Sequence, residues 1–302
     1  MPFTFLPNGC SWYETHKLGG CIRLTSPRVV CLPASAKPSH AIAHRLAVLV
    51  PYRMTSGIRA RDLTGVQELC RRLPPHLTRH QGLRHQIFIV NQTDSKPFNR
   101  GALVNAAVQT LQSDTNSSGR AARRRRGFDY LAIHDADRFP VNTNRSDCNM
   151  HTASYYTFPA PTPRVLNPDS FAGGVLVLST ALYRAVNGFS NEYWGWGEED
   201  NDLFLRLRWC GLPPKHGDAL ERCMEHNDCV ECKRHKERSH GPKLAAHTAR
   251  LHARLPNPRP HMLRDGLSTL NFTLDGINHR RCGAVKVIVL QISLLSHAAH
   301  PS

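Results

Sequence analysis

Short apolar runs alternate with helix-like segments along most of this chain, and this alternation restricts the possible folds more than any other feature of the sequence. The apolar runs lie at residues 46–50, 86–90, 130–133, 175–178 and 285–290. Helical candidates lie at residues 61–72, 101–111, 180–186 and 200–210. Apolar strands separated by helices are typical of an α/β domain with a mainly parallel central sheet. We therefore expect ligand-binding residues at the carboxyl edge of that sheet.

The regions outside this alternation set the expected domain limits. Residues 1–44 are rich in Pro, Ser and Cys and show no sustained period, so we predict a poorly structured leader or stem there. The folded domain is expected over residues 45–302. Inside it, residues 113–127 combine loop formers with a basic cluster, and residues 221–240 are crowded with Cys, His and charge. We interpret both segments as insertions.

Charge and cysteine content leave several classes of partner open. The formal net charge is +16, with 39 Lys and Arg residues against 23 Asp and Glu residues. This favours nucleic acid, phosphorylated small molecules or acidic glycans as partners. The ten cysteines are scattered and do not form a small disulfide scaffold. Four glycosylation sequons favour a secretory route weakly, and they begin at Asn91, Asn116, Asn144 and Asn271.

No membrane anchor or signal peptide is expected within this sequence. A membrane-spanning helix needs roughly 18 to 20 apolar residues, and the longest apolar run, at residues 284–295, is interrupted by Lys286 and Gln291. We interpret that run as a final buried strand. The first 40 residues lack the basic flank, apolar stretch and cleavage site of a signal peptide.

Two acidic residues follow the third apolar run directly. In His134-Asp135-Ala136-Asp137 the carboxylates are two positions apart, and residues at i and i+2 of an extended segment face the same side. Two converging carboxylates suit a hard cation such as Mg²⁺ or Mn²⁺, which in turn binds phosphate oxygens. The alternative is an Asp-rich turn that only ends the strand.

A second cluster combines tryptophans, glycines and acids at the expected start of a helix. The segment reads Tyr193-Trp194-Gly195-Trp196-Gly197-Glu198-Glu199-Asp200-Asn201-Asp202. Indole rings provide apolar faces on which sugars stack, and a helix N-terminus favours negative charge. An acid there is placed to accept the proton of an acceptor hydroxyl. Helix capping by these acids is the alternative, and it leaves the interleaved tryptophans and glycines unexplained.

Several short motifs occur along the chain in a fixed order. They are Leu49-Val50-Pro51-Tyr52-Arg53, Asn91-Gln92, Phe98-Asn99-Arg100-Gly101-Ala102-Leu103-Val104-Asn105, His134-Asp135-Ala136-Asp137, Phe171-Ala172-Gly173-Gly174-Val175, Asn187-Gly188-Phe189-Ser190, Trp194-Gly195-Trp196-Gly197 with Glu199-Asp200, and Asp265-Gly266-Leu267. With these motifs, the chain resembles the β-1,4-galactosyltransferase family over roughly residues 45–292. The spacing before Phe98 is closer to the xylosylprotein 4-β-galactosyltransferase branch than to the branch acting on N-acetylglucosamine.

This resemblance implies a GT-A type nucleotide-sugar fold and an inverting transfer of galactose from UDP-galactose in β-1,4 linkage. It also implies Mn²⁺ as the cofactor and the Golgi lumen as the location. The implied acceptor is a glycan or a proteoglycan core protein, with xylose or N-acetylglucosamine as the acceptor sugar. A nucleic-acid partner is not expected.

The resemblance further implies a role for each matching residue. Asp200 is the implied general base, and Glu199 helps to position the acceptor sugar. The implied donor-binding residues are Pro51, Tyr52, Arg53, Phe98, Arg100, Asp135, Gly174 and Trp196. The implied acceptor-binding residues are Trp194, Trp196, Glu199 and Asn201. The implied metal ligands are Asp137 and His240.

The chain departs from the family pattern at several positions. The family has a further metal ligand, His or Met, shortly before the position of His240, and Glu237 or His235 are the substitutes available here. Asn201, Phe171 and Thr55 stand where the family commonly has Asp, Tyr and Arg. A catalytically inactive family member that binds nucleotide or glycan is therefore one alternative. A basic nucleic-acid-binding protein is another, suggested by Arg123 to Arg126 and by Cys223, Cys229 and Cys232.

Overall fold

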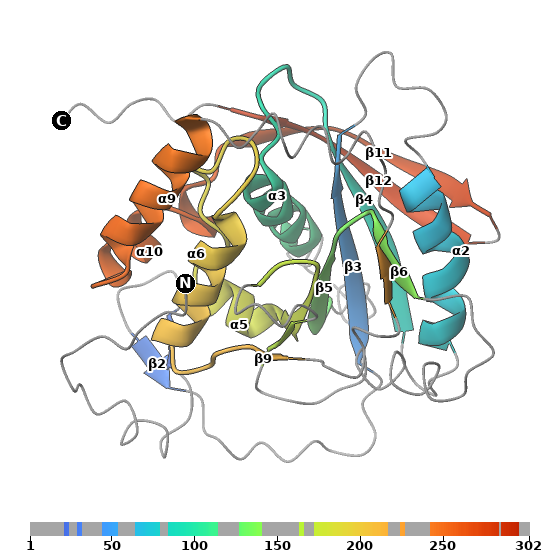
Figure 1. Cartoon of the computed structure of the whole chain (residues 1–302). Helices are drawn as coiled ribbons and strands as arrows, with labels where there is room; N and C mark the ends of the chain where they lie inside the picture. The colour runs from blue at the N-terminus through green and yellow to red at the C-terminus, as the bar shows by residue number, and fades with distance from the viewer. Residues whose placement is uncertain are drawn as a thin grey trace.

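A mixed sheet of eight strands runs through the centre of the computed structural model (Figure 1). The structure describes residues 21–23, 29–31, 44–53, 64–78, 84–113, 127–140, 163–165, 172–216, 224–226, 242–283 and 285–295. In spatial order the strands of the sheet are β11 (Phe272–Cys282), β12 (Val285–Leu294), β4 (Arg84–Gln92), β3 (Arg45–Tyr52), β5 (Tyr130–His134), β8 (Val175–Ser179), β7 (Arg164–Val165) and β9 (Lys215–His216).

The centre of this sheet is parallel, as the sequence predicted. Strands β12, β4, β3 and β5 run parallel to one another, and β7 pairs in parallel with β9. Strands β11, β8 and β7 add antiparallel pairings on the two sides. The carboxyl ends of β3, β4 and β5 therefore meet at one edge of the sheet, where the residues that follow them can form a site.

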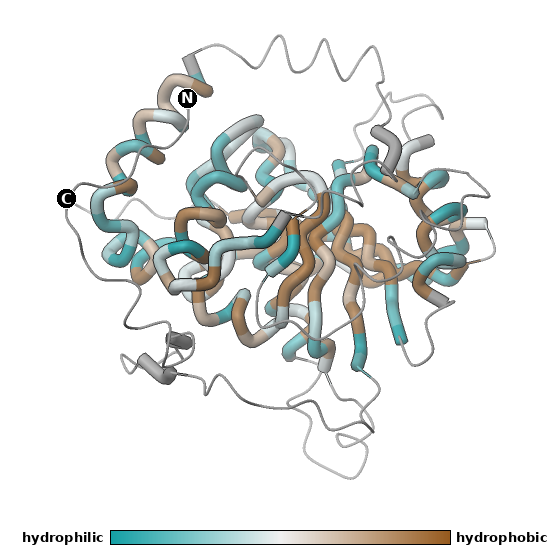
Figure 2. The backbone as a smooth tube through the Cα atoms, turned by 60° about the horizontal axis from the view of Figure 1, so that its bottom comes forward, coloured by the Kyte–Doolittle hydropathy of each residue, from teal (hydrophilic) through white to brown (hydrophobic). Residues whose placement is uncertain are grey.

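Helices cover both faces of the sheet because its central strands are apolar on both faces. In β3, Leu46 and Val48 pack with α2 (Thr64–Thr78), whereas Ala47 and Leu49 pack with α3 (Arg100–Ser113). This alternation follows from the two-residue period of a strand. Figure 2 shows the same arrangement as hydrophobic strands between more polar outer segments.

The other helices lie mainly on the α3 side of the sheet. They are α5 (Thr180–Ala185), α6 (Glu199–Trp209), α9 (Pro242–Arg254), α10 (Arg259–Arg264) and the 3₁₀ turn η3 (Leu267–Thr269). Two small antiparallel pairs complete the described structure, β1 (Cys21–Arg23) with β2 (Val29–Cys31) and β10 (Met224–His226) with β6 (Arg138–Pro140). No described helix is long and apolar enough to cross a membrane.

The five strands and four helices predicted from the sequence are all present, with ends shifted by a few residues. The final apolar run is a strand, as predicted, but it lies inside the sheet between β4 and β11. The sequence analysis missed β11, α9 and α10. Strand β11 is largely exposed, so its sequence lacks the apolar alternation that marks a half-buried strand. Helix α9 carried a usable signal, because it begins with Pro242 and is rich in Ala, Leu and Arg.

The domain limits stay a prediction. The pair β1 and β2 lies within the predicted leader. Most of the two predicted insertions, including Arg123 to Arg126 and His240, lies outside the described residues.

Candidate active site

The loop between β4 and α3 is fixed to the end of β3. The guanidinium of Arg53 donates to the backbone carbonyls of Lys96 and Asp94, the latter at 2.6 Å. The amide of Gln92 donates to the carbonyl of Pro97 at 3.0 Å and accepts from the backbone N–H of Asn99 at 3.0 Å. These hydrogen bonds hold one edge of the sheet in place. This edge contains four predicted donor-binding residues, Pro51, Tyr52, Arg53 and Phe98. In this structure the guanidinium of Arg53 binds and stabilises the loop between β4 and α3.

Helix α3 begins at this edge and places Arg100 in the site. The side chain of Asn99 caps the helix, because its Oδ1 accepts the backbone N–H of Ala102 at 2.9 Å. The Nε and Nη2 atoms of Arg100 lie 2.9 and 2.8 Å from Oδ1 of Asp135, which follows β5. The Nη1 atom lies 4.0 Å from Oε1 of Glu199, the first residue of α6. Arg100 thus connects two of the predicted acidic residues that are far apart in the sequence.

Three buried atoms of this cluster make no well-aligned hydrogen bond among the described residues. They are Nη1 and Nη2 of Arg100 and Oε2 of Glu199, although Nη2 lies 2.8 Å from Oδ1 of Asp135. Buried polar atoms in native proteins are nearly always paired, with protein, water or ligand. Burial would lower the pKa of Arg100, but the carboxylates of Asp135, Glu199 and Asp200 raise it above its ordinary value. A permanently charged guanidinium with a free N–H is suited to bind an anionic ligand.

The first turn of α6 carries two acids whose ionisation is disfavoured. Burial and the neighbouring charge of Asp200 raise the pKa of Glu199 to about 8. Burial also raises the pKa of Asp200, although Arg100 opposes this shift. Its Oδ1 atom accepts the backbone N–H of Asn201 at 2.9 Å. A carboxylate with a raised pKa is a better proton acceptor than an ordinary aspartate, so Asp200 has the properties of a general base.

We expect Glu199→Gln to remove a pH-dependent loss of stability. The pKa of Glu199 in the folded protein, about 8, lies above the ordinary value of 4.5, so between these values the folded state keeps a proton that the unfolded chain has released. The stability contributed by protonated Glu199 is complete below about pH 4.5 and is lost as the pH rises through about 8. Urea unfolding of the metal-free protein at about pH 5.5 and about pH 8.5 measures this loss. Equal losses in the wild type and the variant would contradict the prediction.

The tryptophan segment lies between α3 and α9. The backbone N–H of Gly195 donates to the carbonyl of Phe98 at 2.7 Å. Trp194 is partly buried against the core, whereas 45% of Trp196 is exposed. The carbonyl of Gly197 lies 3.1 Å from Nδ1 of His247 in α9. An exposed indole on a short glycine-flanked loop is suited to cover a bound sugar.

The predicted metal ligands are only partly described. Asp137 lies partly buried in the turn after β5, and this turn packs closely on the start of α2. A Cβ atom at Gly65 would lie 2.7 Å from the carbonyl oxygen of Ala136, so the close approach requires glycine. His240 lies outside the described residues, two positions before α9 begins. Among the described residues no group of three His, Cys, Asp or Glu side chains could hold an ion.

Two of the glycine-containing motifs support the backbone of the site. The carbonyl of Gly174, where φ is +72°, accepts the backbone N–H of Asp135 at 2.9 Å. Gly174 therefore helps to hold the backbone of Asp135 in position in this structure. A Cβ atom at Gly266 would lie 2.1 Å from the carbonyl oxygen of Asn187, which explains the glycine of the Asp265-Gly266-Leu267 motif.

A buried charge network behind the site was missed by the sequence analysis. Asp202 pairs with Arg206 at 2.6 Å and with Arg254 at 2.5 Å, and these interactions lower the pKa of Asp202 against the effect of burial. Asp265 accepts the backbone N–H of Asn191 at 2.8 Å and the hydroxyl of Ser190. The network joins α6, α9 and the segment before Trp194. Of this network, the sequence motifs contained only Asp265, the acid that follows α10. The residues that pair with Asp265 are distant from it in the sequence.

Comparison with solved structures identifies the fold. The catalytic domain of Drosophila β-1,4-galactosyltransferase 7, solved with xylobiose, matches with a TM-score of 0.59 and 25% sequence identity, over 84% of this chain and 95% of that chain. A variant of the Drosophila enzyme in complex with manganese, UDP-Gal and xylobiose gives a TM-score of 0.58 at 24% identity, with the same coverage. The fold and its carboxyl-edge site define a glycosyltransferase domain of the GT-A type.

Sequence comparison identifies the family. Family models described as the N-terminal region of glycosyl transferase group 7 and the N-terminal domain of galactosyltransferase match residues 25–151 and 155–228. β-1,4-Galactosyltransferase 7 is 35% identical over 57% of this chain and 47% of its own length in Drosophila melanogaster, and 36% identical over 56% and 45% in Homo sapiens. Xylosylprotein 4-β-galactosyltransferase of Caenorhabditis elegans is 34% identical over 57% and 53%. The matches span about half the length of these relatives. From the family models and these relatives together, the chain belongs to the β-1,4-galactosyltransferase family.

Proposed function

We propose that this chain is an inverting, Mn²⁺-dependent β-1,4-galactosyltransferase that moves galactose from UDP-galactose to the xylose of a proteoglycan linker. The observation that carries the proposal is the buried cluster in which Arg100 joins Asp135 to the acids of α6. Transfer from a nucleotide sugar needs positive charge near the diphosphate and a carboxylate base near the acceptor. The cluster provides both groups, because the guanidinium of Arg100 lies close to the acids at the start of α6.

The relatives support the donor, the cofactor and the acceptor of this proposal. Two of the three relatives described above are β-1,4-galactosyltransferase 7 enzymes, and the third is a xylosylprotein 4-β-galactosyltransferase. The related Drosophila enzyme was solved with xylobiose, and a variant of it with manganese and UDP-Gal as well. We assign xylose to this chain from these relatives, with N-acetylglucosamine as the competing acceptor sugar.

The donor is assigned to the edge formed by β3, β5 and the start of α3. We propose that Pro51, Tyr52 and Arg53 contact the uridine and phosphate end of UDP-galactose, together with Phe98. Arg100 has a buried N–H without a partner among the described residues, and this group is available to the diphosphate. Asp135, held by the backbone of Gly174, is assigned to the galactosyl side of the donor. Trp196 is assigned to the cover over donor and acceptor.

The metal is assigned to Asp137 and His240. Carboxylate and imidazole groups fit Mn²⁺, and both Asp135 and Asp137 follow strand β5. When bound, the ion supplies positive charge that offsets the charge of the diphosphate leaving group. The further ligand, Glu237 or His235, belongs to the same segment as His240.

Asp200 is assigned as the general base. In the transfer, an acceptor hydroxyl oxygen forms the new bond to the anomeric carbon of galactose while the bond from that carbon to the phosphate oxygen breaks. UDP leaves with the electron pair, and the hydroxyl proton passes to Asp200. Trp194, Trp196 and Glu199 are assigned to the acceptor sugar. Asn201, the remaining predicted acceptor-binding residue, donates one side-chain N–H to Glu198.

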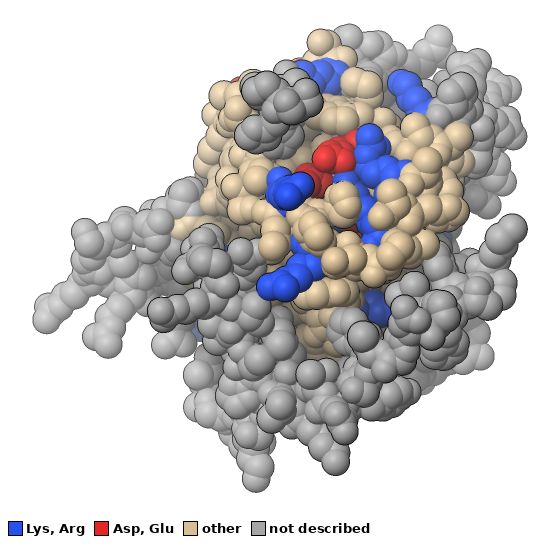
Figure 3. All heavy atoms as spheres, turned by 90° about the vertical axis from the view of Figure 1, so that its left-hand side faces the viewer, with Lys and Arg blue, Asp and Glu red and all other residues tan. Residues whose placement is uncertain are grey.

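A basic surface near the site suits an anionic acceptor. Figure 3 shows the side of the molecule on which α9 and α10 lie, where a few Asp and Glu atoms are set in a depression surrounded by Lys and Arg atoms. Residues 242–264 contain no Asp or Glu, and Lys243, Arg259 and Arg264 within them are exposed. Such a surface attracts an acidic glycan or an acidic core protein.

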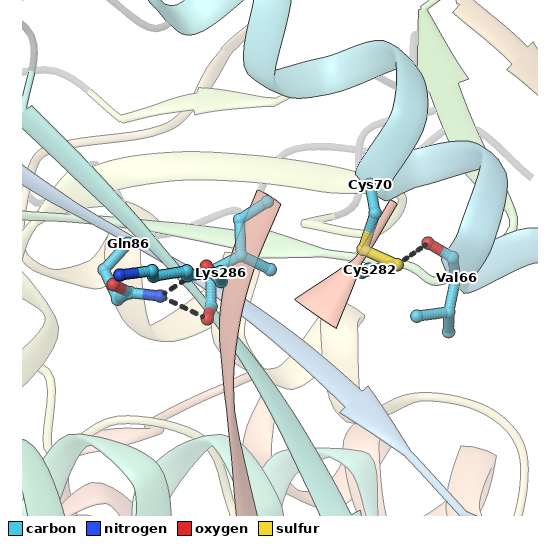
Figure 4. Close-up of a disulfide and its surroundings, with 6 residues drawn as sticks. Val66, Cys70, Gln86, Cys282 and Lys286 are labelled. Carbon is cyan, nitrogen blue, oxygen red and sulfur yellow. Dashed lines mark hydrogen bonds between the residues drawn. A yellow bond between two sulfur atoms is a disulfide. The ribbon is translucent and has the colours of Figure 1, made fainter. Parts of the chain in front are cut away.

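We further propose a location in the Golgi lumen. A disulfide joins Cys70 of α2 to Cys282 of β11 across a sequence separation of 212 residues (Figure 4), and disulfides persist in oxidising compartments. The sequon at Asn271 begins on an exposed residue, whereas Asn91 is buried and donates to Gln291 at 2.7 Å. A glycan on Asn271 of the chain recovered from its natural host, together with co-localisation with a Golgi marker, is the expected result.

Acceptor-dependent release of UDP tests the proposed function. With Mn²⁺ and UDP-galactose, the purified chain is expected to release UDP only when a β-xyloside is added, and the product should carry a β-1,4-linked galactose. An N-acetylglucosaminide run in parallel identifies the branch. Binding of UDP without transfer to either acceptor would favour the inactive family member instead. Absence of UDP binding, with retention of nucleic-acid binding, would favour the basic binding protein.

A further inference from the structure

The loop that carries Trp196 is fastened to α9 by one acidic side chain. Glu198 accepts the hydroxyl of Thr248 on Oε1 at 2.9 Å and the side-chain amide of Asn201 on Oε2 at 2.5 Å. Both carboxylate oxygens of Glu198 are therefore used. We name these three residues, Glu198, Asn201 and Thr248, the Glu198 clamp.

The backbone at Glu198 adopts a conformation that a glycine would adopt more easily. Its φ is +72°, and only Asn187 shares a positive φ among the described non-glycine residues. A left-handed conformation is sterically unfavourable for a residue other than glycine. The side chain of Glu198 accepts no capping hydrogen bond from the backbone N–H groups at the start of α6, so helix capping does not account for it. The contacts of its carboxylate with Asn201 and Thr248 are the interactions that offset the strain.

The clamp lies next to a segment that is flanked by two glycines. Trp196 is flanked by Gly195 and Gly197, whose φ values are +103° and +106°. A Cβ atom at Gly195 would meet nothing within 4 Å, whereas one at Gly197 would lie 2.7 Å from Leu244 of α9. The loop is open on the side of Gly195 and held against α9 on the side of Gly197. Two contacts therefore hold the loop against α9: that of Glu198 with Thr248 and that of the Gly197 carbonyl with His247.

We propose that Glu198 is a positioning residue, which through Asn201 and Thr248 holds Trp196 over the acceptor site and so sets the affinity for the acceptor sugar. This inference rests on the proposed transferase activity. It also accounts for Asn at position 201, where an Asp would place a second carboxylate beside that of Glu198. Electrostatic repulsion between the two would open the clamp.

Asn201→Asp tests the clamp. We expect the KM for the β-xyloside to rise about tenfold, the loss expected for one hydrogen bond to a charged group, with kcat nearly unchanged. The double variant Glu198→Gln with Asn201→Asp reverses donor and acceptor within the same pair and is expected to restore the KM to within about threefold. If the double variant does not restore it, Asn201 contacts the acceptor directly and the clamp is overturned.

A second pair of variants separates positioning from folding. Thr248→Val removes the hydroxyl at nearly constant volume and is expected to raise the acceptor KM, whereas Thr248→Ser keeps the hydroxyl and the wild-type KM. The thermal midpoint should stay close to wild type in both. Equal acceptor KM values for the two variants would overturn the proposal.

Hydrogen exchange of residues 194–198 gives a readout that needs no activity. Asn201→Asp and Thr248→Val are expected to accelerate exchange there, and the double variant and Thr248→Ser are expected to restore it. If the wild type transfers no galactose but this pattern is found, the proposed function fails and the clamp stands. Unchanged exchange in Asn201→Asp and Thr248→Val would overturn the clamp in either case.

Discussion

Replacing Asp200 with Asn is expected to reduce acceptor-dependent galactose transfer by about 10²- to 10⁴-fold, the usual contribution of a general base. Asp200 lies in the first turn of α6, and burial raises the pKa of its carboxyl. The amide of Asn has nearly the same size and can still accept the backbone N–H of Asn201, so the fold should be retained. It cannot take up the proton of the acceptor hydroxyl. Steady-state UDP release with saturating β-xyloside measures the effect.

Binding of the donor separates loss of the base from loss of the site. In Asp200→Asn, the affinity for UDP-galactose with Mn²⁺ should stay within a few-fold of wild type. Glu68→Gln provides a matched change of charge away from the site, because Glu68 pairs only with Arg71 and Arg72 of its own helix among the described residues. Its transfer rate should equal that of the wild type. Full activity in Asp200→Asn would rule out Asp200 as the base.

Replacing Arg100 with Met is expected to lower the free energy of unfolding by about 3 to 5 kcal/mol near neutral pH, as for other buried ion pairs that lose one partner. The change leaves the carboxylates of Asp135, Glu199 and Asp200 without the cation that lies among them. The pKa values of Glu199 and Asp200, both already raised, should rise further. Because these carboxyls can then take up protons, the loss should be smaller at about pH 5 than at about pH 8. Urea unfolding of the metal-free protein at both pH values measures it.

Arg71→Met is the control for this experiment. Arg71 forms an exposed ion pair with Glu68 on α2, and such pairs contribute about 0 to 1 kcal/mol. A loss in Arg100→Met no larger than that in Arg71→Met would show that the cluster of charges does not need its cation. Adding Glu199→Gln to Arg100→Met should recover part of the stability at about pH 8, because Gln is neutral without having to take up a proton on folding.

The positions of the central strands could be predicted because each of these strands is buried on both faces. The runs around Leu46, Ile87 and Leu131 consist of apolar residues, and no other element accommodates such short apolar segments as well. Strand β11 could not be predicted in this way. It is exposed along most of its length and exists because β12 pairs with it from Phe272 to Cys282, with one irregularity between Leu274 and Gly276.

The residues of the site were predicted individually, but their interactions were not. The sequence marked Asp135, Arg100, Glu199 and Asp200 as four separate positions. Their contact through one guanidinium depends on where β5, α3 and α6 end in space. The network of Asp202, Arg206, Arg254 and Asp265 was missed for the same reason, since no spacing in the sequence relates α6 to α9.

The class of fold, the positions of the main strands and the acids and tryptophans that mark the site could be predicted from the sequence alone, because hydrophobic periodicity and residue chemistry are local properties. The pairing of the charges and the side chains that hold the loop of Trp196 became visible only in the folded structure. Those outcomes depend on distances between residues such as Glu198 and Thr248, which are 50 positions apart in the chain and 2.9 Å apart in the fold. Electrostatic and hydrogen-bond energies fall steeply with distance, so they follow from the packing of α6 against α9 and cannot be derived from either segment alone.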